Sequence, residues 1–155
     1  MMPAPLEIRL PDEAATARLA ERLAARARPG DVLLLDGPIG AGKSCLARAF
    51  IRARLGNPAE EVPSPTFTLV QTYPSDAGEI WHCDLYRLSG PDAVIELGLD
   101  EAFEEAICLV EWPDRLGDLA PAGALRISMA AGNDGHSATI TAPPGWAERL
   151  ERIDG

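Results

Sequence analysis

Apolar and polar residues repeat with different periods along the chain, and each change of period marks an expected element. Leu6 to Leu10 alternates between apolar and polar residues, which predicts a short edge strand. Asp12 to Arg28 carries leucines four residues apart among alanines and charges, which is typical of an amphipathic helix. Asp31 to Asp36 encloses an unbroken apolar run, as buried strands of parallel sheets do. Lys43 to Leu55 predicts a second helix, because a glycine, an asparagine and a proline follow it.

The second half of the chain has shorter periodic segments, separated by turn residues. Strands are predicted over Thr66–Tyr73, Glu79–Leu85, Ala106–Glu111, Leu125–Ala130 and His136–Ala142, and short helices over Pro91–Leu97, Leu99–Glu105, Pro113–Leu119 and Trp146–Ile153. The turns Ser75–Gly78 and Gly132–Gly135 predict two hairpins. Strands and helices alternate early and strands dominate late, so we expect an α/β sheet with antiparallel additions. No linker divides it, and residues 1–155 are expected to form a single domain.

Charge excludes some classes of function. The 155 residues include 14 basic and 24 acidic side chains, for a net charge of −10. A chain this acidic is a poor stand-alone binder of nucleic acid or of an anionic membrane, because phosphates are recognised mainly through lysine and arginine. Lys43 is the single lysine among the basic residues.

Cysteine and histidine are too few for a structural metal site or a disulfide framework. Three cysteines form no Cys-x-x-Cys pair, and there are only two histidines. Met1 to Leu10 has no basic region of the kind that precedes a secretory signal. We therefore expect a protein of the reducing cytoplasm.

A glycine-rich turn carries the strongest chemical signal. It has the spacing GxxxxGK[ST] between a predicted buried strand and a predicted helix. Glycines let backbone N–H groups converge on phosphate oxygens, and the helix presents its positive end to the same anion. Lys43 reaches the β- and γ-phosphates, and the Ser44 hydroxyl can ligate Mg²⁺. The predicted nucleotide-binding residues are Gly37, Pro38, Ile39, Gly40, Ala41, Gly42, Lys43, Ser44 and Cys45. The fold expected around this loop is a P-loop NTPase-like, mixed and mostly parallel sheet flanked by helices.

Nucleotide hydrolysis or transfer also needs a group that holds Mg²⁺ and a group that positions the nucleophile. In open α/β sheets these groups lie at the carboxyl ends of strands. Asp84 and Glu111 each end a predicted strand, so either one could be the metal-linked acid. His82 lies two residues before Asp84 and therefore on the same face of the strand, where a packed, hydrogen-bonded histidine is the expected role.

Two more residues border this predicted site. Thr66 follows two prolines in a stiff loop, so its hydroxyl either belongs to ordinary turn chemistry or faces Mg²⁺ and the γ-phosphate, as in a switch loop. Cys45 lies at a helix N-terminus, where the pKa of a thiol tends to fall. No catalytic role is expected for Cys45.

Together these segments resemble the TsaE (YjeE) family, the ATPases of bacterial tRNA threonylcarbamoyladenosine biosynthesis. The resemblance covers about residues 12–116. It rests on five segments in order, namely Gly37–Ser44, Ser64–Val70, His82–Leu88, Glu96–Leu99 and Glu111–Pro113. The chain departs from the family at Pro38-Ile39, where Asp-Leu is frequent, and at Ser44-Cys45, where Thr-Thr is frequent. Serine keeps the hydroxyl that ligates the metal.

The resemblance implies an ATPase that uses ATP and Mg²⁺ in a cytoplasmic complex with the proteins TsaD and TsaB. Such a protein supports tRNA modification without being the threonylcarbamoyl transferase, and it meets tRNA only through its partners. Lys43, Thr66, Asp84 and Glu111 are then the expected catalytic residues, and Ser44 and Asp84 the metal ligands. Glu111 is the candidate for positioning water, although the two acids could exchange these roles.

Other P-loop functions make different demands on the sequence. A small-molecule kinase is the main alternative, but such kinases carry an arginine-bearing lid, and few arginines follow Glu111. A GTPase usually needs an Asn-Lys-x-Asp element, which is absent because the only lysine lies in the phosphate loop. A nucleotide-gated interaction module without useful catalysis has the same motifs and stays open.

Overall fold

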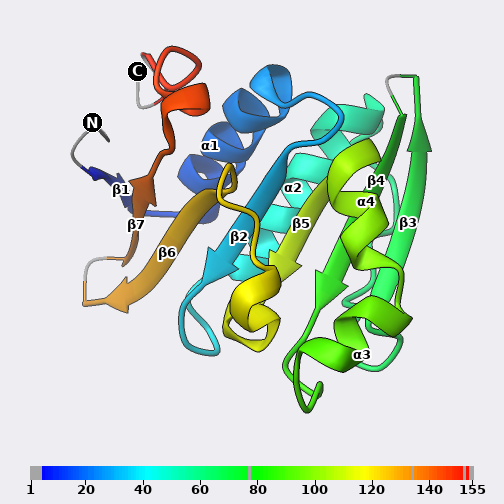
Figure 1. Cartoon of the computed structure of the whole chain (residues 1–155). Helices are drawn as coiled ribbons and strands as arrows, with labels where there is room; N and C mark the ends of the chain where they lie inside the picture. The colour runs from blue at the N-terminus through cyan, green and yellow to red at the C-terminus, as the bar shows by residue number, and fades with distance from the viewer. Residues whose placement is uncertain (1–4, 77, 134, 152, 154–155) are drawn as a thin grey trace.

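One seven-stranded sheet, in the order β1-β7-β6-β2-β5-β4-β3, organises the molecule (Figure 1). The structure is a computed structural model that describes residues 5–76, 78–133, 135–151 and 153. The strands are β1 (Leu6–Leu10), β2 (Val32–Asp36), β3 (Val70–Ser75), β4 (Gly78–Asp84), β5 (Ile107–Glu111), β6 (Leu125–Gly132) and β7 (Gly135–Thr141). The helices are α1 (Glu13–Arg26), α2 (Lys43–Leu55), α3 (Pro91–Glu96) and α4 (Leu99–Glu105), with 3₁₀ segments η1 (Pro113–Leu119) and η2 (Pro144–Trp146).

The centre of the sheet is parallel and both of its edges are antiparallel. β2 pairs in parallel with β5 and with β6, and β4 pairs in parallel with β5. β3 is antiparallel to β4 at one edge, while β7 is antiparallel to β6 and β1 at the other. The expected α/β fold with antiparallel additions is confirmed, and Leu6–Leu10 is the edge strand that its alternation predicted. The carboxyl ends of β2, β5 and β4 lie next to one another at the same end of the strands, the lower end in Figure 1.

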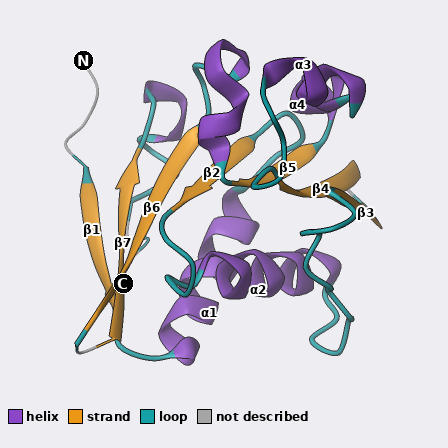
Figure 2. Ribbon diagram, turned by 90° about the horizontal axis from the view of Figure 1, so that it is seen from below, coloured by secondary structure: helices purple, strands orange, loops and turns teal. Residues whose placement is uncertain are grey.

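Helices cover both faces of the sheet, and this explains the unbroken apolar runs. Figure 2 shows α1 and α2 on one face and α3 and α4 on the other. Along β2, Leu33 and Leu35 face the first layer, whereas Val32 and Leu34 face the second. Because side chains alternate across a strand, a strand covered on both faces needs apolar residues at every position.

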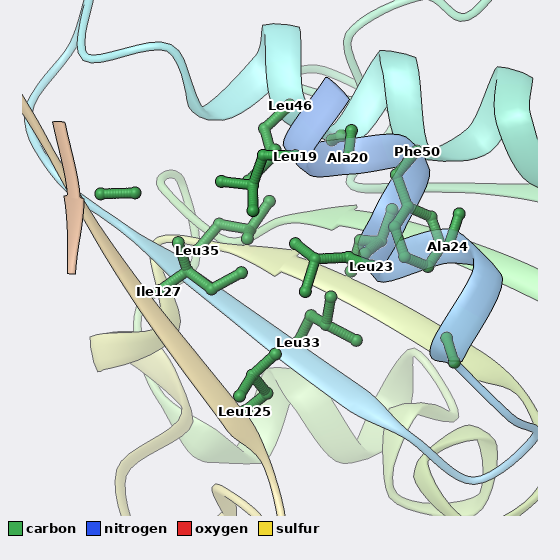
Figure 3. Packing of buried hydrophobic residues seen from close by; sticks show 14 of the residues in the cluster. Leu19, Ala20, Leu23, Ala24, Leu33, Leu35, Leu46, Phe50, Leu125 and Ile127 are labelled. Carbon is green, nitrogen blue, oxygen red and sulfur yellow. The ribbon is translucent and has the colours of Figure 1, made fainter. Parts of the chain in front are cut away.

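The larger core lies between the sheet and the pair α1 and α2 (Figure 3). Leu19 and Leu23 of α1, four residues apart, point toward Leu33 and Leu35 of β2. Phe50 of α2 fills the space beside Leu23. Side chains this deeply buried contribute roughly 1.5–3 kcal/mol each by transfer from water, so this layer holds α2, and with it the start of α2, firmly against β2.

Local signals fix the ends of the two long helices. The Asp12 carboxylate accepts a hydrogen bond from the Ala15 amide at 2.8 Å and so caps α1. Gly56 ends α2 in a left-handed conformation, with φ of 65°, and its amide bonds back to the last turn. Both helices agree with the predicted ranges to within about two residues, as expected of helix ends.

Two predicted segments differ from the structure. Thr66 to Leu69 was predicted as strand but forms a turn, closed by a 2.6 Å hydrogen bond from the Leu69 amide to the Pro65 carbonyl. Leu69 takes a φ of 71°, which no strand allows. The predicted terminal helix is also wrong for its described residues, because only η2 and irregular turns form there. Trp146 is buried, and the Arg149 guanidinium stacks 3.9 Å from its ring and pairs with Asp31.

A few predicted positions lie outside the described residues. These are Met1 to Ala4, Ala77 and Asp134 in the two predicted turns, and Arg152 in the predicted terminal helix. Within the described ranges, every helix is too short or too polar to cross a membrane.

Candidate functional site

The two strand-end acids lie side by side because β4 and β5 run parallel in register. Asp84 is the register partner of Glu111, and Glu111 is in turn opposite Leu35 of β2. The loop that follows β2 therefore starts beside both acids. This edge is where the topology predicted a ligand site.

Backbone conformation shapes the loop between β2 and α2. Gly37 has a φ of 139°, and a Cβ at this position would lie 2.4 Å from the Met129 carbonyl oxygen of β6. Gly42 has a φ of 100° and precedes α2 without a side-chain cap, so the N-cap residue leaves the first amides of α2 available to a ligand. A loop of this kind presents N–H groups to an anion at the positive end of the helix.

Lys43 is buried, with 5% of its surface exposed, and its ammonium has two neighbours. It donates a short hydrogen bond to the Gly37 carbonyl, and it lies 3.6 Å from the centroid of the Trp112 ring. Burial lowers the pKa of Lys43, although Glu111 and Asp84 act in the opposite direction. The ammonium is thus held by neutral groups that anionic phosphate oxygens can replace.

Trp112 owes its position to a strained backbone. It takes a φ of 58° between Glu111 and Pro113, in a left-handed conformation that bulky residues rarely adopt. Its ring contacts that of Tyr86 at a centroid distance of 4.8 Å. The conformation places the Trp112 ring against the ammonium of Lys43.

Glu111 links the phosphate loop to β4. The Ser44 hydroxyl donates to its Oε1 at 3.1 Å, and His82 Nε2 donates to its Oε2 at 2.7 Å. Glu111 and His82 are both buried. Both carboxylate oxygens are therefore oriented by hydrogen bonds, which supplies what a buried carboxylate requires.

Asp84 has a separate set of partners. Its Oδ2 accepts from the Thr66 hydroxyl at 3.2 Å, and its Oδ1 accepts from the Tyr86 amide at 3.0 Å. Thr66 also contacts the Ser64 hydroxyl, at 2.8 Å. The turn at Thr66 to Leu69, unlike the predicted strand, brings this hydroxyl to the end of β4, where the Leu69 carbonyl accepts from the Asp84 amide.

These groups line one cleft of about 640 Å³. Of the predicted residues, Pro38, Ile39, Gly40, Gly42, Lys43, Ser44, Cys45, Thr66, Asp84 and Glu111 line it. Gly37 and Ala41 do not: Gly37 packs against β6 and Ala41 is fully buried, so they shape the loop from behind. A cleft of this size accommodates a nucleotide.

Other residues line the cleft that no sequence motif had indicated. Pro11, Asp12, Glu13 and Thr16 come from the start of α1, and Gly135 and His136 from the hairpin β6–β7. His136 Nε2 donates to the Gly40 carbonyl at 2.9 Å and so ties the hairpin to the phosphate loop. The successive pairing of β6 with β2, β7 with β6 and β1 with β7 brings these segments to the cleft.

The expected fall in the pKa of the Cys45 thiol is wrong, whereas the absence of a catalytic role stays a prediction. Burial raises the pKa of this thiol, and the nearby Glu13 carboxylate adds to the increase. The neighbouring Arg48 and Arg52 act in the opposite direction. Cys45 is therefore less reactive than its place at a helix N-terminus suggested.

The donors at the metal end of the cleft are all oxygen atoms. They are the hydroxyls of Ser44 and Thr66 and the carboxylates of Asp84 and Glu111. The described residues contain no group of three His, Cys, Asp or Glu side chains that could hold a metal ion. Mg²⁺ commonly takes one or two carboxylates and completes its shell with waters and substrate phosphates. The donor set therefore fits Mg²⁺ that arrives with a nucleotide.

Comparison with known proteins agrees with this geometry. Residues 10–139 match the family described as "Threonylcarbamoyl adenosine biosynthesis protein TsaE". The chain is 40% identical over 129 residues to the tRNA threonylcarbamoyladenosine biosynthesis protein TsaE of Bacillus subtilis, covering 82% of this chain and 79% of the relative. It is 37% identical over 120 residues to the Rickettsia bellii protein of the same name, covering 77% and 83%.

A solved structure extends the similarity to the fold. The crystal structure of Bacillus subtilis YdiB superposes with a TM-score of 0.78 at 32% sequence identity, covering 99% of this chain and 95% of that one. The family match spans the phosphate loop, both strand-end acids, β6 and the first part of β7. On its sequence and its fold, this chain belongs to the TsaE family of threonylcarbamoyl adenosine biosynthesis proteins.

Proposed function

We propose that this chain binds Mg·ATP in the cleft at Lys43 and hydrolyses it. We further propose that it does so as the ATPase of tRNA threonylcarbamoyladenosine biosynthesis, in a cytoplasmic complex with TsaD and TsaB. Its relatives are named for that pathway, which supports the assignment. The observation that carries the chemical part is the contact between the phosphate loop and a strand-end acid, where the Ser44 hydroxyl meets Glu111 Oε1 at 3.1 Å.

The phosphate end of the nucleotide lies at the start of α2. The free amides after Gly42 and the Lys43 ammonium bind the β- and γ-phosphate oxygens. Lys43 then exchanges the Gly37 carbonyl and the Trp112 ring for charged partners. Because these two present partners are uncharged, the exchange favours an anionic ligand.

Ser44 and Asp84 would hold Mg²⁺, with the Thr66 hydroxyl beside Asp84. When bound, the ion neutralises charge on the β- and γ-phosphates. Ser44 would ligate the ion through a lone pair of its hydroxyl oxygen while its O–H still donates to Glu111 Oε1. A second lone pair of that carboxylate oxygen would accept a hydrogen bond from the attacking water. The bond from the water oxygen to the γ-phosphorus forms while the bond to the β–γ bridging oxygen breaks. ADP leaves, and the proton lost by the water ends on the released phosphate.

The charge of the chain agrees with an indirect encounter with tRNA. With a net charge of −10, its surface is ill suited to hold a polyanion. We therefore assign tRNA binding to the partner proteins and the nucleotide cycle to this chain.

Phosphate release tests the proposal. It is measured from Mg·ATP with the purified chain, alone and with purified TsaD and TsaB from the same source, and Lys43→Ala is the control for contaminating ATPases. We expect release that depends on Lys43 and rises when both partners are present. The partnership is wrong if a TsaD–TsaB pair of proven activity changes nothing. Phosphate transfer that requires a metabolite acceptor would instead indicate a kinase.

A further inference from the structure

A buried histidine outside the predicted catalytic set contacts the proposed water-positioning acid. His82 of β4 is 1% exposed, and its Nε2 lies 2.7 Å from Glu111 Oε2, with both side chains almost fully buried. Among the described residues, its Nδ1 has no hydrogen-bond partner. The ring is therefore tied to the protein through a single polar contact, and that contact is Glu111.

The two oxygens of Glu111 differ in how they are held. Oε1 accepts from Ser44 at 3.1 Å, and both residues line the cleft, so this oxygen lies on the side where the nucleotide and water would enter. Oε2 faces His82 inside the sheet, where neither nucleotide nor solvent competes for it. His82 is therefore the partner that holds the carboxylate from the buried side, away from the cleft.

We propose that His82 is a positioning residue for ATP hydrolysis, which fixes Glu111 so that Oε1 faces the attacking water. This inference rests on the proposed function, because it assigns His82 a role through Glu111 in that reaction. His82 is not among the residues that line the cleft, so its removal should affect the chemical step rather than nucleotide binding. A carboxylate misplaced by about 1 Å can lower a rate by about 100-fold.

A merely structural role makes different predictions. Loss of packing at β4 would lower stability and would disturb Thr66, Lys43 and the whole cleft together. Loss of positioning lowers kcat through Glu111 alone. The length of the replacement side chain separates the two roles, because a glutamine amide nitrogen reaches the place of Nε2, whereas an asparagine amide ends near Nδ1.

The test compares His82→Gln, His82→Asn and His82→Leu with the wild-type protein. Steady-state hydrolysis gives kcat and KM, affinity for a non-hydrolysable ATP analogue reports the cleft, and thermal melting reports folding. We expect His82→Leu and His82→Asn to lower kcat by about 10- to 100-fold, with KM and analogue affinity nearly unchanged. We expect His82→Gln to restore most of the rate. If the leucine variant does not fold, the glutamine and asparagine pair still decides the question.

A double-mutant cycle gives the second readout. If His82 acts through Glu111, then adding His82→Asn to Glu111→Gln causes no further loss of kcat. Tyr73→Phe on β3 is the matched control, because it removes another buried polar group without a described partner and should leave hydrolysis unchanged. Equal rates for the glutamine and asparagine variants, or independent losses in the cycle, would overturn the proposal. Absence of Lys43-dependent hydrolysis in the wild-type protein would overturn the proposed function instead.

Discussion

The parallel centre of the sheet differs from its antiparallel wing, which consists of β6, β7 and β1, in where it buries charged side chains. β5 is buried at all five positions and nevertheless ends in a carboxylate, Glu111. β6 alternates regularly between buried and exposed residues, and its one charged side chain, Arg126, faces solvent. Of the described residues, the buried lysine, arginine, histidine, aspartate and glutamate side chains are Lys43, His82, Asp84 and Glu111, and none belongs to the wing.

The free-energy cost of burying charged groups therefore falls on the centre of the sheet. Burying ionisable groups without partners costs several kcal/mol each, in round numbers. In the centre, hydrogen bonds between Ser44, Glu111 and His82 offset part of that cost. The described residues of the wing include no such buried group. The wing contributes packing, part of the cleft lining at Gly135 and His136, and the hydrogen bond of His136 to the Gly40 carbonyl. Mutations in the centre should therefore lower ATP hydrolysis more than stability, and mutations in the wing should lower stability more than hydrolysis.

The largest effect is expected at Lys43. Lys43→Ala removes the ammonium that meets the phosphates, so ATP binding and hydrolysis should both be lost, while the melting temperature should not fall. The absence of a fall is expected because burial already opposes the charged form of this lysine. Calorimetric titration with Mg·ATP is the measurement. Unchanged nucleotide affinity would remove the loop from the site.

Glu111 comes next. Glu111→Gln keeps the shape of the side chain but removes the negative charge beside the water, so kcat should fall by about 100- to 10,000-fold with nucleotide affinity retained. Single-turnover hydrolysis with radiolabelled ATP measures this directly. Wild-type turnover would exclude Glu111 from the reaction, and the corresponding Asp84→Asn variant would then show whether the two acids exchange roles.

In the wing, mutation should lower stability and leave hydrolysis unchanged. Ile127 of β6 is fully buried against the α1 and α2 layer (Figure 3), and Ile127→Ala should lower the free energy of unfolding by about 2–4 kcal/mol. Hydrolysis per folded molecule should stay close to that of the wild-type protein. Urea unfolding and phosphate release are the two measurements. Arg126→Ala, at the exposed neighbouring position, is the control and should change neither.

The smallest effect concerns thiol reactivity. The raised pKa of Cys45 leaves less thiolate at pH 8, so alkylation by iodoacetamide should be several-fold slower than for an unfolded chain and should accelerate as the pH rises. Cys83 and Cys108 should not react in the native protein, because burial raises the pKa of Cys83 strongly and that of Cys108 to about 12. Mass spectrometry locates the modification, Cys45→Ser is the control, and ATP should protect Cys45. Rapid alkylation at pH 7 would contradict the assignment.

The predictable part of the site is local in sequence. Lys43 and Ser44 follow from the spacing of one loop between a strand and a helix, and Asp84 and Glu111 from their position at strand ends. Residues 66–69 were misjudged because β-branched and aromatic composition favours a strand, whereas two preceding prolines and the Leu69 to Pro65 hydrogen bond close a turn. The terminal helix failed for a similar reason, since Trp146 and Arg149 bind distant residues and fix another path.

The sequence by itself determined the class of fold, the phosphate loop and the two candidate acids, because each depends on spacing within a few residues. Tertiary structure decided which acid meets Ser44, that His82 is joined to that acid, and that His136 closes the cleft from the other side. These contacts span 29 to 96 residues of sequence, from His82–Glu111 to Gly40–His136. They exist because strand order sets which ends become neighbours, and strand order is settled by the packing of the whole sheet rather than by any one segment.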